Sequence, residues 1–470
     1  MSARSGGKPR NHLLRSEAAP DKGTRGRLRR GLLGIDPPRR SSILIAAAFA
    51  VTTALWIAAH RDHIGDTSDF WPWRALSQLT VLWATTLMAI AMLAVVRARA
   101  LEPIFAGLDR AVRLHRSIGL AALLLLAAHV ACLVLMAARR GEAVGDMLVP
   151  FWSAEARSID ILVFYALALL GILAYDKRMR YERWLLVHRF IGLLLIAGTI
   201  HAATEPGTIH DFEPLRTWVV LLILVGAAAW LYRVFLFNRF GPLHRYRLEQ
   251  AAVRGQDFVD LVMRPVERRM MYEPGAFVFI RVPSLARHGR ELHPFSISSS
   301  PVERDLRVSI RMVGDFTRNL PQLAPNTPIS VYGPFGGFTL QRFASYRRLV
   351  LIGAGIGITP FLGMLAFELS NRDFRRIWLY YVVRDEASAV HDAEIRESYL
   401  NAESYIDYYP WLTARDGHIT AKAVADQVAP LDDYAVMLCG RSRFVADLAR
   451  QFRALGIPSS RIITEDLQFR

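Results

Sequence analysis

The sequence predicts a multidomain membrane protein, in which a bundle of six transmembrane helices precedes an antiparallel β-barrel domain and an α/β domain. Three observations predict this order. Six long apolar blocks come before residue 240. Alternating polar and apolar residues then follow, as in half-buried strands separated by Gly and Pro turns. Near residue 347 the pattern changes to an apolar strand, a glycine-rich turn and a helix, which is typical of an α/β unit.

The composition favours a membrane protein over a nucleic-acid-binding one. Hydrophobic residues make up 52% of the 470 residues and charged residues 21%, with a mean hydropathy of +0.21. These values exclude a disordered or fibrous chain. Of the formal net charge of +16, a balance of +8 lies in residues 1–40, which hold 11 Lys+Arg against 3 Asp+Glu. A basic tail before the first apolar block fits the cytosolic preference of Lys and Arg. We therefore expect contact with the lipid bilayer and no nucleic-acid partner.

Cysteine usage excludes two kinds of metal centre. The chain has only Cys132, in an apolar block, and Cys439, in the polar C-terminal half. No CxxC pattern exists, so a thiolate zinc site and an all-cysteine iron–sulfur cluster are excluded within one chain.

The six apolar blocks are each assigned to one membrane crossing, since a spanning helix needs about 20 residues. The fourth and fifth blocks have shorter uncharged runs, and buried soluble helices are the alternative for them. Basic residues gather in segments 97–116, 176–183 and 233–247. We therefore expect these segments and both termini to lie in the cytosol. The protein is expected in the cell (inner) membrane. The blocks cover residues 43–59, 76–96, 117–138, 161–175, 186–204 and 217–237.

Four histidines lie inside two of these blocks. His115 and His129 are 14 residues apart in the third block, and His188 and His201 are 13 apart in the fifth. Ionisable residues inside a membrane are costly and usually functional. Neutral imidazole is an axial haem ligand, and 14 helical residues rise about 21 Å, so the two helices are predicted to hold two stacked haems. The inner haem would use His115 and His188, and the outer one His129 and His201.

Helical phase distinguishes the two blocks. Fourteen residues leave two imidazoles roughly 40° apart around a helix, whereas 13 leave them roughly 140° apart. The fifth helix must therefore bend, unwind locally or present its histidines at different azimuths, and Gly192 and Gly198 supply some freedom.

Other histidines fall in the predicted outer loops. We expect His60, His63 and His210 to be solvated there. Arg61 and His63 are also candidates to guide an anionic acceptor, with a plain solvated loop as the alternative.

A glycine-rich turn marks the start of the α/β domain. Gly353, Gly355 and Gly357 in LVLIGAGIGITPFLGML follow a strand and open a helix, so backbone N–H groups can approach a pyrophosphate. The spacing is not G-x-G-x-x-G, and no acidic residue for a ribose follows about 20 residues later. Arg384 follows the next strand, where a cation favours a 2′-phosphate, and an ordinary surface arginine is the alternative.

Five motifs occur in one order, namely HPFSISS (293–299), GDFT (314–317), GPFGGF (333–338), GAGIGITP (353–360) and CGRSRF (439–444). This order resembles ferredoxin–NADP reductase-like modules. Joined to helices with paired histidines, the chain resembles the ferric reductase/NADPH oxidase family of transmembrane flavocytochromes b over about residues 43–470.

The resemblance implies an FAD site and a nicotinamide site. Phe295 is expected to pack against the flavin, the Gly314 and Thr317 turn to hold the FAD pyrophosphate, and Phe469 in EDLQFR to cover the flavin. His293 and Phe295 stand where related soluble reductases have Arg and Tyr. The implied FAD residues are His293, Pro294, Phe295, Ser296, Gly314, Thr317 and Phe469. The implied NAD(P) residues are Gly353, Gly355, Gly357, Thr359, Pro360, Arg384, Cys439 and Gly440.

The expected activity is electron transfer from cytosolic NADPH, or NADH, through FAD and two b-type haems to an acceptor outside, either dioxygen, giving superoxide, or ferric iron. An electron relay to an extracytoplasmic redox partner is the alternative, and a non-catalytic haem sensor or scaffold is disfavoured by the flavin and nucleotide motifs. No acid–base catalyst is expected. The predicted domains are a tail (1–42), the haem-binding helices (43–240), an FAD-binding barrel (241–345) and an NAD(P)-binding domain (346–470).

Overall fold

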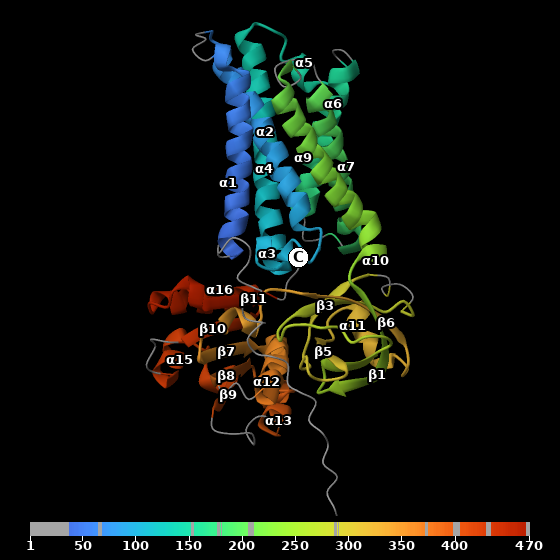
Figure 1. The fold of residues 1–470 in the computed structure, drawn as a ribbon, viewed down its shortest axis with the longest axis vertical. Helices are drawn as coiled ribbons and strands as arrows, with labels where there is room; N and C mark the ends of the chain where they lie inside the picture. The colour runs from blue at the N-terminus through green and yellow to red at the C-terminus, as the bar shows by residue number, and fades with distance from the viewer. Residues whose placement is uncertain are drawn as a thin grey trace, which may run out of the picture.

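A computed structural model describes most of residues 37–466, and Figure 1 shows a long helical bundle standing on two lobes that contain β-sheets. The basic tail up to residue 36 lies outside the described residues. So do residues 64–67, 152–154, 176–178, 180, 205–210, 286–288, 290, 372–374, 398–404, 429–433 and 467–470.

Each predicted apolar block lies largely within one long helix of the bundle. These helices are α1 (Pro37–Ala59), α2 (Trp71–Ala94), α4 (Leu108–Arg139), α6 (Glu155–Tyr175), α7 (Tyr181–Thr204) and α9 (Glu213–Leu231). A π-helical turn (Tyr232–Leu236) and α10 (Phe237–Phe240) extend the last of them towards the lobes.

Four helices in the described part of the chain are long and apolar enough to cross a membrane. They cover Arg40–Ala59, Trp71–Ala94, Leu108–Arg139 and Glu213–Phe240, and a shorter apolar helix covers Ser158–Ala174. The expected count of six crossings is therefore not reached by this criterion.

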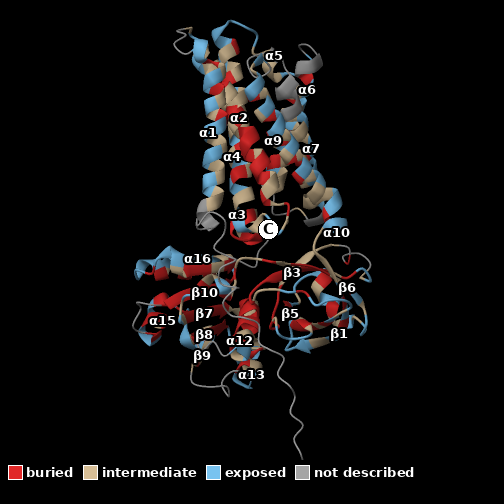
Figure 2. Ribbon diagram, viewed as in Figure 1, coloured by how far each residue is buried: buried red, intermediate tan, exposed pale blue. Residues whose placement is uncertain are grey.

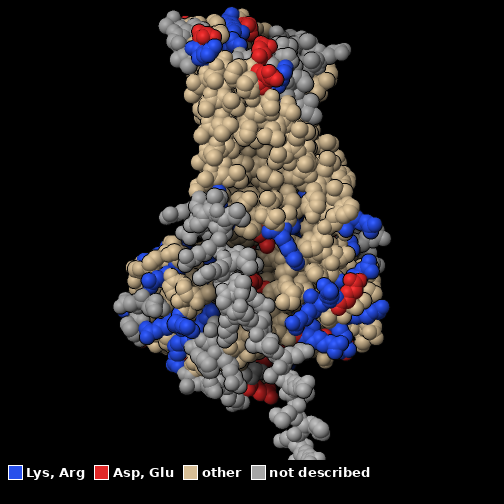
Figure 3. Space-filling model, viewed as in Figure 1, with Lys and Arg blue, Asp and Glu red and all other residues tan. Residues whose placement is uncertain are grey.

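The surface of the bundle fits a lipid environment. On the face that Figure 3 shows, a broad zone of the bundle has no charged side chains, and Lys, Arg, Asp and Glu lie above and below it. Large apolar side chains of the bundle face outward, among them Leu124 (63% exposed), Ile172 (71%) and Leu224 (61%). Such a continuous apolar surface would aggregate in water but is stable against lipid. The chain is therefore a membrane protein.

The first lobe, here called the antiparallel lobe, has a six-stranded sheet in the order β4-β3-β6-β1-β2-β5. Just after β4, an isolated bridge between Ile297 and Val308 joins this edge of the sheet to the other edge strand, β5. The expected antiparallel β-barrel is thus a half-barrel, because β4 pairs along its length with β3 and not with β5. The strands are β1 (Leu243–Arg254), β2 (Phe258–Pro265), β3 (Phe277–Arg281), β4 (His293–Ser296), β5 (Leu306–Arg311) and β6 (Pro328–Phe335).

The second lobe, here called the parallel lobe, has a five-stranded parallel sheet in the order β11-β10-β7-β8-β9. Helix α12 (Thr359–Asn371) contributes to the apolar core on one face of the sheet. Helices α15 (Ala421–Val428) and α16 (Ser442–Ala454) contribute to the core on the other face. Figure 2 shows both cores as buried segments. The strands are β7 (Arg348–Ala354), β8 (Arg376–Val383), β9 (Ile406–Leu412), β10 (Tyr434–Gly440) and β11 (Ile462–Asp466).

The bundle and the antiparallel lobe share one apolar cluster. Phe105 from α3 (Glu102–Phe105) and Phe237 from α10 pack with Phe279 and Tyr332 of the sheet. The guanidinium of Arg97 lies 3.9 Å from the centre of the Phe279 ring, a cation–π contact between the loop after α2 and β3. These contacts hold the sheet directly beneath α2 and α4.

Glu102 lies at this junction and outside the spanning helices. Its Oε1 accepts a hydrogen bond from the N–H of Gly336 at 3.2 Å. Burial raises the pKa of Glu102 from 4.5 to about 7, although the Gly336 N–H and Arg99 act in the opposite direction. Between these two values the folded protein holds a proton that the unfolded chain has released, so stability falls as the pH rises.

We therefore expect Glu102→Gln, which keeps an acceptor oxygen but cannot ionise, to lose less thermal stability than the unsubstituted protein between about pH 5 and about pH 8. Unfolding midpoints of detergent-purified protein measure this difference. Glu267→Gln, at an exposed position in the antiparallel lobe, is the control. Equal pH slopes for Glu102→Gln and the unsubstituted protein would contradict the prediction.

Candidate functional site

Both histidines of α4 are oriented by the backbone of α2. The ring atom Nδ1 of His115 lies 2.9 Å from the carbonyl oxygen of Ala91. Nδ1 of His129 lies 2.9 Å from both the carbonyl oxygen and the hydroxyl of Ser77. A hydrogen bond at Nδ1 fixes the ring and leaves Nε2 available to a metal, as is usual for metal-ligating histidines.

His188 of α7 lies opposite His115. The two ring centroids are 5.7 Å apart with planes at 77°. Two metal–nitrogen bonds of roughly 2 Å each, with the ring radii added, require a similar separation. Trp184 stacks on His188 at 5.0 Å and 10°, which restrains that ring. The inner pair, His115 and His188, therefore fits bis-imidazole ligation of one haem iron.

In the outer pair, His129 and His201, only His129 has a described side chain. His201 lies within α7, but its side chain is outside the described residues. Helix α7 is one α-helix from Tyr181 to Thr204. Thirteen residues along such a helix leave His188 and His201 on different faces. The position of the His201 ring itself lies outside the described residues. Among the residues that the structure describes, no cluster of three or more His, Cys, Asp or Glu could hold a bare metal ion.

Two expectations for the outer loops have different outcomes. His60 is not solvated, and this prediction was wrong: it is 1% exposed, its Nδ1 lies 2.9 Å from the Trp56 carbonyl oxygen, and its ring stacks on Trp56 at 4.5 Å. Aromatic neighbours bury it although it follows the end of α1. His63, in contrast, is exposed, as expected. His210 lies outside the described residues.

The predicted FAD motif forms β4 and the segment after it. Register places Pro294 opposite Phe279 and Phe295 opposite Val278, so the motif is one strand away from the contact with Arg97. The ring of His293 stacks on Phe316 at 3.7 Å, and Phe295 lies 6.3 Å from Phe316.

The GDFT turn is closed by its own threonine. Thr317 Oγ1 accepts the N–H groups of Val313 and Gly314, each at 3.0 Å, and donates to the Gly314 carbonyl. A Cβ on Gly314 would meet nothing within 4 Å, so a ligand can reach the backbone there. Pyrophosphate binding at this turn stays a prediction.

The glycine-rich turn requires glycine at two positions for different reasons. Gly355 has φ +55°, a conformation that other residues adopt only with strain. A Cβ on Gly357 would lie 2.3 Å from the carbonyl oxygen of Cys439, so only glycine lets the turn approach the end of β10. Thr359 and Pro360 are buried at the start of α12, and the Thr359 hydroxyl donates to the Ile356 carbonyl.

The ends of three parallel strands meet around this turn. Cys439 pairs with Gly353 in the sheet, and Gly440 follows it. Arg384 follows β8 at the same edge and is exposed. The carboxyl edge of a parallel sheet is where ligands of such folds bind. The structure therefore brings the predicted nucleotide residues together.

Sequence reasoning missed one residue of this edge. Glu465 is 2% exposed, and its Oε2 lies 3.9 Å from the Cys439 Sγ in the adjacent strand β10. The EDLQFR ending drew attention to Phe469, which lies outside the described residues, rather than to the buried acid four positions earlier.

Known sequence families divide the chain in the same order as its structure. Residues 80–199 match the ferric reductase like transmembrane component, 244–333 an FAD-binding domain and 351–450 an oxidoreductase NAD-binding domain. Fold and site thus define a membrane-bound oxidoreductase with binding domains for FAD and a nicotinamide nucleotide. The chain thus carries the three domains in the order expected of the ferric reductase/NADPH oxidase family, and it is similar to relatives named NADPH oxidase.

Named relatives include oxidases and reductases. NADPH oxidase 1 of Mus musculus is 30% identical over 219 residues, covering 41% of this chain and 36% of the relative. A heavy chain from the superoxide-generating NADPH oxidase of Dictyostelium discoideum is 24% identical over 311 residues, covering 58% and 55%. The ferredoxin reductase component of 3-ketosteroid-9-alpha-monooxygenase from Rhodococcus rhodochrous is 28% identical, covering 42% and 56%. The matches therefore span between 36% and 56% of the length of these relatives.

Proposed function

We propose that the protein transfers electrons from cytosolic NAD(P)H, with FAD and two bis-histidine haems as carriers, to an acceptor on the outer side of the membrane. The observation that carries this proposal is the orientation of His115 and His129 by α2, together with His188 facing His115 at 5.7 Å. When bound, a flavin accepts hydride and passes on single electrons, which a haem can take.

The residues of the chain then act by binding and positioning. His115 with His188, and His129 with His201, would hold the haems. Residues 293–296 with Gly314 and Thr317 would hold FAD, and the Gly353–Gly357 turn with Cys439 and Gly440 would bind the nucleotide. This assignment uses no acid–base catalyst. It includes a cytosolic location for both termini, which the basic segments of the sequence favour.

The acceptor is proposed to be dioxygen, giving superoxide, or chelated ferric iron. The relatives named as superoxide-generating oxidases favour dioxygen. The second candidate function is an electron relay to an extracytoplasmic redox protein, and the family match to a ferric reductase like transmembrane component is compatible with either.

Anaerobic spectra of detergent-purified protein before and after NADPH addition test the proposal. We expect two low-spin b-type haems and one FAD, all reduced by NADPH. Re-oxidation by oxygen or by ferric chelate then separates the acceptors, and turnover only with an added redox partner would identify the relay. Haem without flavin, or haems that NADPH cannot reduce, would refute the proposed function.

Arg384 provides a test of nucleotide preference. Its exposed guanidinium at the end of β8 is placed to meet a 2′-phosphate, so Arg384→Ala should weaken NADPH about tenfold while leaving NADH nearly unchanged. Apparent affinities from flavin reduction at varied nucleotide concentration measure this. Equal losses for both nucleotides would make Arg384 an ordinary surface residue.

A further inference from the structure

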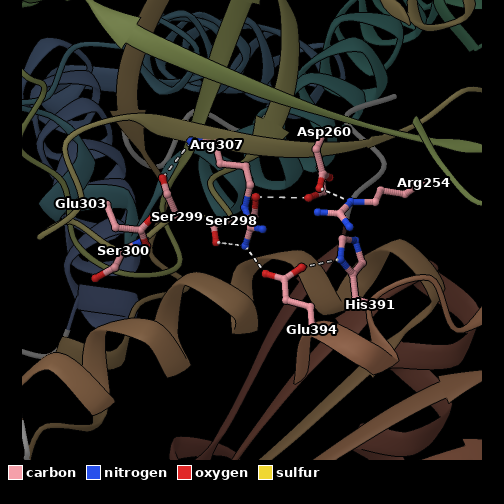
Figure 4. A network of polar contacts seen from close by, with 10 residues as sticks. Arg254, Asp260, Ser298, Ser299, Ser300, Glu303, Arg307, His391 and Glu394 are labelled. Carbon is pink, nitrogen blue, oxygen red and sulfur yellow. Dashed lines mark hydrogen bonds and ion pairs between the residues drawn. The ribbon is translucent and has the colours of Figure 1, made fainter. Parts of the chain in front are cut away.

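The two lobes are joined by a polar cluster that includes Arg307 and Glu394. Figure 4 shows Arg307 of the antiparallel lobe reaching Glu394 of α13 (Asp392–Ile395) in the parallel lobe. Arg307 Nη2 lies 2.6 Å from Glu394 Oε1. The other carboxylate oxygen of Glu394 lies 3.2 Å from Nδ1 of His391, which is fully buried.

Arg307 also holds the segment that continues the FAD motif. Its guanidinium donates to the Ser298 carbonyl at 3.2 Å, and its backbone N–H donates to the Ser299 hydroxyl at 2.9 Å. The Ser298 N–H in turn donates to the Arg307 carbonyl at 2.8 Å. Arg307 therefore contacts both the segment that follows the strand with the predicted flavin residues and the lobe that carries the predicted nucleotide turn.

The opposite side of this segment is in contact with α12. A Cβ on Gly363 would lie 2.6 Å from the Ser299 carbonyl oxygen, so the helix that begins at the nucleotide turn packs directly on the segment. Residues 297–300 are thus held between β5 and α12. A shift of α13 relative to β5 would change the distance between the flavin motif and the nucleotide turn.

Polar and apolar side chains of both lobes lie beside this ion pair. A cavity of about 390 Å³ lies between them, lined by Glu303, Asp305, Arg307, Glu394, Ala366 and Leu369. Arg307 and Glu394 are each less than one-fifth exposed. Burial alone would raise the pKa of Glu394, but His391 and Arg307 lower it to about 2, so the ion pair persists at neutral pH.

We propose that Arg307 is a positioning residue which, through Glu394, holds the parallel lobe in register with the flavin motif for hydride transfer. This inference rests on the proposed function, because it assigns a role within the same nucleotide-to-flavin step. Misplacement of reacting groups by about 1 Å from a distant substitution can cost about 100-fold in rate. Loss of the ion pair should therefore affect the rate of flavin reduction more than nucleotide affinity.

The test compares Arg307→Met, Arg307→Lys and Glu394→Gln in the full-length, cofactor-loaded protein. We expect Arg307→Met to lower the limiting rate of flavin reduction by NADPH at least about tenfold, with a smaller change in the apparent NADPH affinity. Arg307→Lys, which keeps the charge, should recover much of the rate. Combining Arg307→Met with Glu394→Gln should slow flavin reduction no more than Arg307→Met alone, since each substitution removes the same ion pair.

The matched control is Arg311→Met, which removes an ion pair with Asp257 from the same strand but within the antiparallel lobe only. Wild-type flavin reduction in Arg307→Met, or multiplicative losses in the double variant, would overturn the inference while leaving the proposed function intact. If NADPH fails to reduce the unsubstituted protein, the proposed function fails, and hydrogen exchange decides the inference. Faster exchange in residues 298–300 and α13 of Arg307→Met, but not of Arg311→Met, supports it, whereas unchanged exchange refutes it.

Discussion

His115→Ala is expected to remove the inner haem and to stop transfer across the membrane while flavin reduction by NADPH continues. The Ala91 carbonyl holds the His115 ring, and no other histidine with a described side chain faces His188 as closely. We expect haem content to fall by half and transfer to an external acceptor to fall to below about a hundredth of its original rate, because the carrier nearest the flavin is lost.

Haem quantification, anaerobic stopped-flow spectra of the flavin and steady-state acceptor reduction measure this result. His188→Ala should behave in the same way, since it removes the opposite ligand. His418→Ala, at an exposed position in the parallel lobe, is the control and should retain both haems. Normal haem content and normal turnover in His115→Ala would remove the inner-haem assignment.

Gly357→Ala is expected to have the complementary effect. Its Cβ would lie 2.3 Å from the oxygen and 2.6 Å from the carbon of the Cys439 carbonyl, and backbone atoms cannot rotate away as a side chain can. The turn must therefore move off the end of β10, which displaces the predicted nucleotide site. We expect flavin reduction by NADPH to slow between about 10-fold and 100-fold, with haem content unchanged.

The control for this variant is Gly226→Ala in α9, where a Cβ would make an ordinary contact of 3.6 Å with the Ala89 Cα. Chemical reduction with dithionite should reduce the haems of Gly357→Ala fully, which separates a nucleotide defect from a folding defect. Flavin reduction at the unsubstituted rate would show that the turn does not bind the nucleotide as proposed.

The two sets of variants therefore separate the two halves of the electron path. His115→Ala interrupts it after the flavin, and Gly357→Ala interrupts it before the flavin. If both variants lost only stability, with no selective effect on haem content or on flavin reduction, His115 and Gly357 would instead have structural roles.

Local patterns in the sequence were sufficient to predict the long helices, the antiparallel sheet and the parallel sheet, because hydrophobic periodicity and glycine turns act over short distances along the chain. They were also sufficient to select His115, His129 and His188, since polar residues in long apolar blocks stand out without any knowledge of packing. Barrel closure was not predictable in this way. It depends on whether the chain around β4 meets β5, and the two meet just after β4, at the bridge between Ile297 and Val308.

The sequence by itself determined the order of the helices, the two sheets and the candidate haem, flavin and nucleotide residues. Only the tertiary structure decided which backbone carbonyls orient His115 and His129, that His60 is buried, and that Arg307 reaches Glu394 across two lobes. The physical reason is that carbonyl groups are the same at every residue and that ion pairs between distant segments leave no periodic signal. Their partners are selected by packing, once the chain has folded.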